Sequence, residues 1–131
     1  TGCQRATTHK PPDPHKATET TTHEVVGEVE GKTCLLVDDM VDTAGTMCQA
    51  ALALKKHGAK RVIAAATHPI LSDPAAERIN NSPIELLLVT NTLKIRDDID
   101  IPAMTLLSIA PLIAKAIQEV FEDGSVTSLF R

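Results

Sequence analysis

The chain of 131 residues is 43% hydrophobic and 23% charged, which suffices for the core of one ordinary domain and excludes global disorder. Its formal net charge is -4 and only 2% of its residues are aromatic, so it offers neither a basic field for nucleic-acid phosphates nor aromatic platforms for stacking bases. No apolar run approaches the roughly 20 residues of a membrane span, and the polar stretch 1–16 lacks a hydrophobic signal region, so we expect a cytoplasmic protein with no membrane partner.

Residues 1–24 differ in composition from the rest of the chain. They are rich in Thr, His and Pro and hold almost no large apolar residues. Such a segment buries too little surface to offset the entropy lost on ordering. We therefore expect a flexible arm over 1–24 and a folded domain over 25–131.

The three cysteines are Cys3, Cys34 and Cys48. Their odd number and wide spacing favour neither a disulfide framework nor a zinc site. Cys34 falls in an apolar strand-like run and Cys48 in a helix-like run, so we expect both to be small buried hydrophobic residues.

Beyond residue 24 the pattern alternates between strands and helices. The continuous apolar run 33–37 is typical of a strand buried on both faces. A helix follows, with an apolar face that ends before Gly58, and Ser108 is expected to cap the last helix. Further strands are predicted at 61–66, 85–89 and 104–107. Helices are predicted at 46–57, from 73 to about 80, and at 109–121. The apolar face of the first helix comprises Met47, Ala50, Ala51 and Leu54.

This order predicts an α/β fold with a mainly parallel sheet flanked by helices. Ligands of such sheets bind at the carboxyl ends of the strands. The residues that follow the strands are therefore candidates for a site: Asp38-Asp39, Thr67-His68 and Thr90-Asn91-Thr92. For His68 the alternative is an ordinary polar residue at a strand end.

The stretch from Val37 to Thr46 carries the strongest chemical signal. A buried strand runs into two adjacent carboxylates, and a short loop then leads into a helix. N–H groups at a helix start carry positive dipole, Gly45 permits close approach of an anion, and threonine hydroxyls add donors. The pattern predicts a phosphate site, with the upstream carboxylates suited to ribose hydroxyls or Mg²⁺. The alternative is that Asp42 or Thr43 merely caps the helix.

The same stretch resembles the phosphoribosyl-pyrophosphate-binding motif of the type I phosphoribosyltransferase-like fold. Later segments resemble the ribose-phosphate pyrophosphokinase (phosphoribosyl pyrophosphate synthase) family, and the resemblance covers about 25–130. Ordinary phosphoribosyltransferases share the binding loop but not these later segments, which are 64–68, 71–72, 74–75, 89–92, 107–112 and 124–130.

The resemblance implies the C-terminal domain of an enzyme that converts ATP and ribose 5-phosphate to phosphoribosyl pyrophosphate and AMP. Asp38 and Asp39 would face the ribose hydroxyls and an associated Mg²⁺. ATP would bind largely on an N-terminal domain to which no part of this sequence is similar, and a homo-oligomer is implied. The loop for the 5-phosphate would consist of Asp42, Thr43, Ala44, Gly45 and Thr46.

Two further parts of the family map onto the ends of this chain. Lys10 falls at the position of a catalytic lysine, whereas Pro12 stands where an arginine is expected and offers no charge or donor to a phosphate. The tail 124–130 resembles a regulatory nucleotide site between subunits, with Ser125, Val126, Thr127 and Phe130 as its candidates. Terminal packing of Leu129 and Phe130 is the alternative.

Two other functions remain open at this stage. Pro12 and the missing ATP-binding domain favour a non-catalytic associated or regulatory subunit. A salvage phosphoribosyltransferase is less favoured, because no insertion that would cover a base is present in the sequence.

Overall fold

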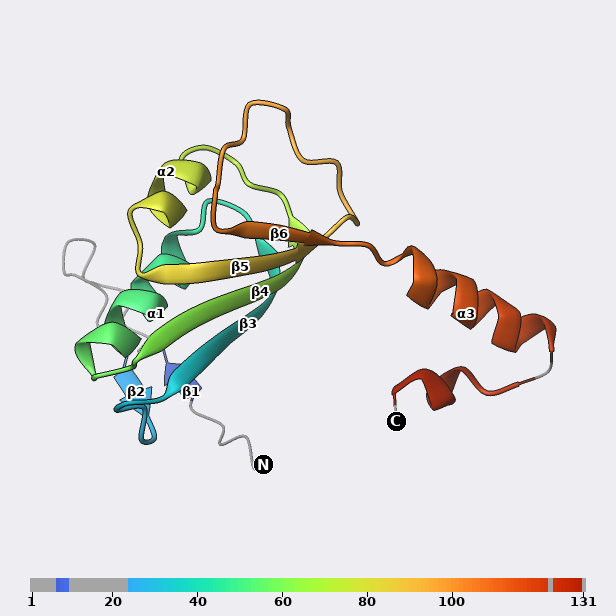
Figure 1. Ribbon diagram of the computed structural model, residues 1–131, viewed down its shortest axis with the longest axis horizontal. Coiled ribbons are helices and arrows are strands. Elements are labelled where there is room, and N and C mark those ends of the chain that lie inside the picture. Colours follow the sequence, from blue (N-terminus) through green and yellow to red (C-terminus); the bar gives the residue numbers. More distant parts are fainter. Residues whose placement is uncertain (1–6, 10–23, 123, 131) are drawn as a thin grey trace, which may run out of the picture.

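A central sheet of parallel strands organises the chain in the computed structural model, which describes residues 7–9, 24–122 and 124–130. The described strands of this sheet lie in the order β3-β4-β5-β6, and every neighbouring pair is parallel. Figure 1 shows these strands side by side, and helices connect β3 to β4 and β4 to β5 along the chain. The predicted α/β fold with a parallel sheet is therefore confirmed, and the strands span β3 (Thr33–Val41), β4 (Arg61–Pro69), β5 (Ile84–Thr90) and β6 (Met104–Leu107).

Helices α1 (Gly45–Lys56) and α2 (Ala75–Asn80) lie on one face of this sheet (Figure 1). The predicted apolar face of α1 is confirmed as buried, and it packs in one core cluster with Val62 and Leu87 of the sheet. Gly58 follows the helix with φ +85°, a conformation that glycine adopts without steric cost, so it ends α1 as predicted. No helix in the described ranges is long and apolar enough to cross a membrane.

The other face of the sheet is open, which corrects one prediction. The strand at 33–37 was expected to be buried on both faces, but Leu35 is 58% exposed and Val37 is 74% exposed. No described helix packs against that side of β3. The burial of a strand face depends on the elements that pack against it, and the apolar content of the strand alone does not determine it. β3 is also longer than predicted, because it continues through Asp38 and Asp39 to Val41.

Helix α3 (Ala110–Phe121) extends away from the sheet instead of covering it (Figure 1). Apolar residues of this helix are exposed, Ile117 by 52% and Val120 by 65%. The 3₁₀ helix η1 (Val126–Phe130) lies against α3. The N-cap residue of α3 is Ile109, and the predicted cap Ser108 lies one residue before it. The Ser108 Oγ still accepts a hydrogen bond from the Ala110 N–H at 3.2 Å.

Two short strands lie within or at the end of the segment 1–24, where the sequence predicted a flexible arm. β1 (Thr7–His9) pairs antiparallel with β2 (Glu24–Val26). The low apolar content of this region did not indicate a strand, because the pairing uses backbone groups that every residue carries. The domain boundary near residue 24 stays a prediction.

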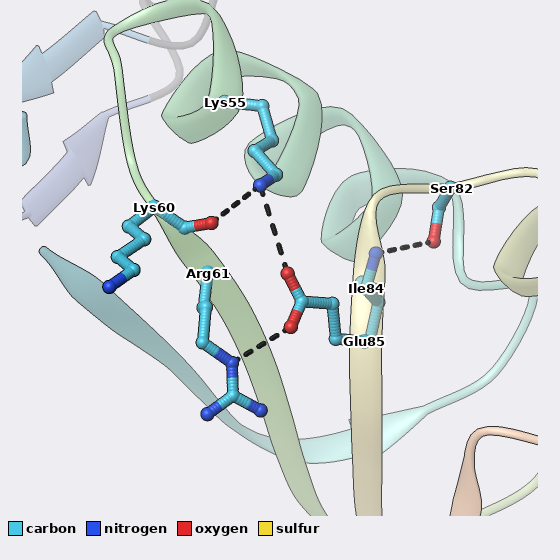
Figure 2. Close-up of polar contacts among 6 residues, drawn as sticks. All are labelled: Lys55, Lys60, Arg61, Ser82, Ile84 and Glu85. Atoms are coloured by element: carbon cyan, nitrogen blue, oxygen red, sulfur yellow. Dashed lines mark hydrogen bonds and ion pairs between the residues drawn. The ribbon is translucent and has the colours of Figure 1, made fainter. Parts of the chain in front are cut away.

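Charged side chains join the elements at the amino end of the sheet, the edge remote from the candidate site. Figure 2 shows the Glu85 carboxylate accepting a hydrogen bond from Arg61 Nε at 2.8 Å, with Lys55 Nζ of α1 at 3.8 Å. The hydrogen bond from Arg61 is the main cause of a lowered Glu85 pKa. Because these groups are exposed, the cluster orients β4, β5 and α1 more than it stabilises them.

Cys48 is buried in α1, as predicted, whereas Cys34 is half-buried against the core and Cys3 lies outside the described residues. Burial raises the pKa of the Cys48 thiol, and this effect outweighs the opposing influences of the Ser82 side chain and the Arg78 charge. Folding therefore favours the neutral Cys48 thiol over the thiolate.

Stability is therefore expected to fall as the pH rises above about 8.5, the ordinary pKa of a cysteine thiol. In that range the unfolded chain loses the Cys48 proton before the folded chain does, so the free energy of unfolding decreases by at most about 1.4 kcal/mol per pH unit. Urea denaturation from pH 7.5 to 10 measures this dependence. Cys48→Ala should give a flatter profile than the wild type, and identical slopes would contradict the assignment.

Candidate functional site

The residues that follow the strands meet at one edge of the sheet, as predicted. In the parallel register Met40 lies opposite His68, and Thr90 lies opposite Leu107. The start of α1 adjoins this edge because only the loop 42–44 separates it from β3. The carboxyl ends of the strands and the amino end of a helix thus surround one region of the surface.

The loop between β3 and α1 enters the helix through an unusual backbone conformation. Ala44 precedes the helix with φ 59°, a left-handed conformation that a non-glycine residue rarely adopts. No side chain forms a capping hydrogen bond at this position, so the alternative in which Asp42 or Thr43 caps the helix is wrong. The first turn of α1 is open to an external acceptor.

The electrostatics of this turn favour an anion. The first N–H groups of a helix have no partner within it, and they carry the positive end of the helix dipole. The first turn of α1 contains no acidic side chain that would neutralise this end. The side chains of Thr43 and Thr46 are exposed at the same place, so their hydroxyls can donate to the same ligand.

Asp38 and Asp39 occupy the last part of β3 and are exposed. The Asp39 N–H donates a hydrogen bond to Asp38 Oδ1 at 2.9 Å. Neighbouring residues of a strand project to opposite faces, and Asp38 lies in register with the buried Ala66, so Asp38 belongs to the face that α1 covers. The two carboxylates therefore reach different sides of the strand.

These carboxylates are compatible with a substrate-associated Mg²⁺. Within the described part of the chain, no group of three or more His, Cys, Asp or Glu residues is arranged to hold a metal ion. Mg²⁺ commonly binds through one or two carboxylates and completes its shell with waters and phosphate oxygens. Asp38 or Asp39 could each supply one such ligand, from its own side of β3, without a closed protein cage.

Arg78 is a site residue that the sequence did not reveal. It projects from α2, and its Nη1 donates a hydrogen bond to the Thr43 carbonyl oxygen at 3.0 Å. A β-carbon placed on Gly45 would lie 3.2 Å from the same nitrogen. Because Arg78 is 35 residues from Thr43 in the chain, no local motif announces this contact.

A network of hydroxyl groups holds His68 at the ends of β4 and β5. Thr90 Oγ1 and Thr92 Oγ1 both donate to the Thr67 carbonyl oxygen, at 2.6 and 3.0 Å. A hydroxyl has one proton, so Thr92 Oγ1 is then an acceptor at its 2.9 Å contact with His68 Nδ1. With the proton on Nδ1, a neutral ring keeps Nε2 as an acceptor. His68 is therefore joined to Thr92 after β5, and whether it contacts a ligand stays a prediction.

The remaining predicted residues are either outside the described part of the chain or in its C-terminal tail. Lys10 and Pro12 fall outside the described residues, as does the side chain of Phe130. In the tail, Ser125 Oγ and Thr127 Oγ1 are 2.6 Å apart. Val126 of η1 lines an apolar groove of about 380 Å³ with residues of α3, so the observed contact is packing against that helix.

Comparison with known proteins gives a consistent result. Residues 5–131 match the family described as the phosphoribosyl synthetase-associated domain. Among curated proteins, the ribose-phosphate pyrophosphokinase of Streptomyces coelicolor is 54% identical over 129 residues, which are 98% of this chain and 40% of the relative. The ribose-phosphate pyrophosphokinase of Mycobacterium bovis is 50% identical over the same shares. The chain thus spans about 40% of the length of the curated relatives that it matches.

The fold is also similar to a solved structure. The crystal structure of phosphoribosylpyrophosphate synthetase from Mycobacterium smegmatis superposes with a TM-score of 0.73 and 52% sequence identity. The superposition covers 81% of this chain and 36% of the other. The similarity therefore extends over most of the described sheet and its helices, and it concerns one part of a larger protein.

Proposed function

Because this chain belongs to the phosphoribosyl synthetase-associated domain family, we propose that it is the sugar-phosphate-binding part of a ribose-phosphate pyrophosphokinase, the enzyme after which its curated relatives are named. Such an enzyme transfers a diphosphoryl group from ATP to ribose 5-phosphate and forms phosphoribosyl pyrophosphate and AMP. In this proposal the ATP site lies largely on a part of the protein that this chain does not contain, and a homo-oligomer in the cytoplasm is its working form.

The observation that carries the proposal is the open first turn of α1. Ala44 turns the backbone into the helix without a side-chain cap, and the N–H groups from Thr43 to Thr46 are available for an anion. In the proposed complex these groups and the two threonine hydroxyls bind the 5-phosphate. Asp42 borders the same loop on the side of β3.

The carboxylates at the end of β3 are proposed to recognise the sugar. Asp38 and Asp39 would accept hydrogen bonds from ribose hydroxyls and offer oxygen ligands to Mg²⁺. When bound, the ion supplies positive charge that stabilises the transferring phosphates. The residues of this chain contribute by fixing the sugar between the phosphate loop and the carboxylates.

The transfer itself requires little covalent chemistry from the protein. The C1 hydroxyl oxygen of the ribose forms a bond to the β-phosphorus of ATP, the bond from that phosphorus to the α-phosphate oxygen breaks, and the hydroxyl proton is lost to a base or to solvent. Positioning and charge stabilisation therefore dominate the rate. Lys10 is proposed to stabilise the transferring phosphates; it directly follows β1 (Thr7–His9) in the chain.

A non-catalytic associated subunit is the second candidate, and Pro12 favours it. This proline stands where the family resemblance leads us to expect an arginine, and it cannot neutralise a phosphate. Such a subunit would bind ribose 5-phosphate or a full-length relative without turnover, and its tail at Ser125, Val126 and Thr127 would take part in regulation between subunits. Co-elution with a full-length relative and a changed activity of that relative would support this candidate.

Replacing Thr46 by valine tests the phosphate loop, because the substitution removes one hydroxyl donor and keeps the side-chain shape. We expect the affinity for ribose 5-phosphate to fall by about tenfold or more, the effect of losing one hydrogen bond to a charged group. Calorimetric titration in the presence of Mg²⁺ measures the affinity. Thr105→Val on the exposed side of β6 is the matched control and should bind as the wild type does. An absence of binding by the wild type would contradict the proposed function.

A further inference from the structure

Arg78 connects two elements that are distant in the sequence. It lies in α2, while its guanidinium reaches the turn before α1 and donates to the Thr43 carbonyl oxygen at 3.0 Å. Among the described residues no carboxylate forms an ion pair with it. Arg61 and Arg96 differ in this respect, since each forms an ion pair with a carboxylate at 3.1 Å or less.

The contact determines the direction of a backbone donor. The Thr43–Ala44 peptide is trans, so its C=O and N–H groups point in opposite directions. A carbonyl that is turned toward Arg78 therefore turns the Ala44 N–H away from Arg78, toward the other side of the loop. This N–H belongs to the turn in which the first N–H groups of α1 are unpaired.

The fit around the guanidinium is tight enough to hold this arrangement. A β-carbon on Gly45 would lie 3.2 Å from Arg78 Nη1 and 3.9 Å from its Cζ. Arg78 also lines a groove of about 410 Å³ between α1 and α2, together with Cys48 and Ser82. The guanidinium thus packs behind the loop, where it can set the backbone orientation.

We propose that Arg78 is a positioning residue for phosphate binding: it holds the Thr43 carbonyl so that the Ala44 N–H points at the anion, and its unpaired positive charge adds to the attraction. This inference rests on the proposed function, because it concerns the same loop and the phosphate of the same sugar. A lysine cannot replace it fully, since its flexible ammonium lacks the fixed planar geometry with which the guanidinium directs its N–H groups.

The test compares Arg78→Met and Arg78→Lys with the wild type, with Arg96→Met as the matched control. Calorimetric titration with ribose 5-phosphate and Mg²⁺ should show about tenfold weaker binding for Arg78→Met, a smaller loss for Arg78→Lys, and no change for Arg96→Met. Because Arg78 is exposed, the unfolding midpoints should remain close to that of the wild type.

A second readout separates positioning from a purely structural role. Residual dipolar couplings report the direction of an N–H bond. Those of Ala44 and Gly45, measured by NMR without ligand, should change in Arg78→Met and stay unchanged in Arg96→Met. Equal affinities and equal couplings in Arg78→Met and the wild type would overturn this inference and leave the proposed function intact. A wild type that does not bind ribose 5-phosphate would overturn the proposed function, and the phosphate role of Arg78 with it.

Discussion

Gly45→Val is expected to weaken the binding of ribose 5-phosphate at least about tenfold, because a branched side chain at this turn would cost the anion at least one hydrogen bond from the backbone. The new β-carbon would lie 3.2 Å from Arg78 Nη1, and the branched methyl groups would occupy space beside the backbone that the anion must approach. Either the guanidinium or the loop has to move. Calorimetric titration with ribose 5-phosphate and Mg²⁺ measures the loss.

The control for this substitution is Leu52→Val. It introduces the same β-branched residue into α1, where the side chain is 56% exposed, and so it reproduces the small cost in helix propensity without touching the loop. We expect near wild-type affinity for Leu52→Val. Binding by Gly45→Val at wild-type strength would show that the anion does not approach the backbone at this turn.

Leu87→Ala is expected to lower the free energy of unfolding by about 2–5 kcal/mol, the range for a leucine deleted from a packed core. Leu87 is 0% exposed in the interior strand β5, and it belongs to the cluster that packs the sheet against α1. Since single domains have only about 5–15 kcal/mol in total, this loss is a large fraction of the stability. Urea denaturation measures it as a lower midpoint with an unchanged slope.

Leu106→Ala is the matched control for Leu87→Ala. Leu106 lies on the neighbouring strand β6 and is 53% exposed. Its truncation should cost less than about 1 kcal/mol, because less surface leaves water on folding. Equal losses for the two leucines would mean that the complete burial of Leu87 does not contribute to the stability of the core.

The sequence predicted the elements and the end of the sheet where the candidate residues gather, because both depend on local patterns. The apolar positions of α1, the stop at Gly58 and the loop from Asp42 to Thr46 are all short-range signals. The order of strands and helices then implied a parallel sheet, and a parallel sheet brings the strand ends to one edge. The loop from Asp42 to Thr46 could therefore be placed at that edge from the sequence alone, and its role as a phosphate site stays a prediction.

The sequence could not predict what depends on neighbours. Leu35 and Val37 form an apolar run, yet their exposure follows from the absence of a described helix over that face of the sheet. The apolar face of α3 was visible in the periodicity, but periodicity does not say whether a partner packs there. Arg78 was missed for the same reason, since its contact with Thr43 exists only after α2 has folded against α1.

Amide-resolved NMR titration of the wild-type chain with ribose 5-phosphate and Mg²⁺ tests the central claim most directly, because it reports where the sugar phosphate binds. We expect the largest shift changes at the amides of Thr43, Ala44, Gly45 and Thr46, with smaller ones at Asp38 and Asp39, and we expect ribose without phosphate to leave the loop amides unshifted. Shift changes confined to other parts of the chain, or none at saturating ligand, would contradict a phosphate site at the start of α1.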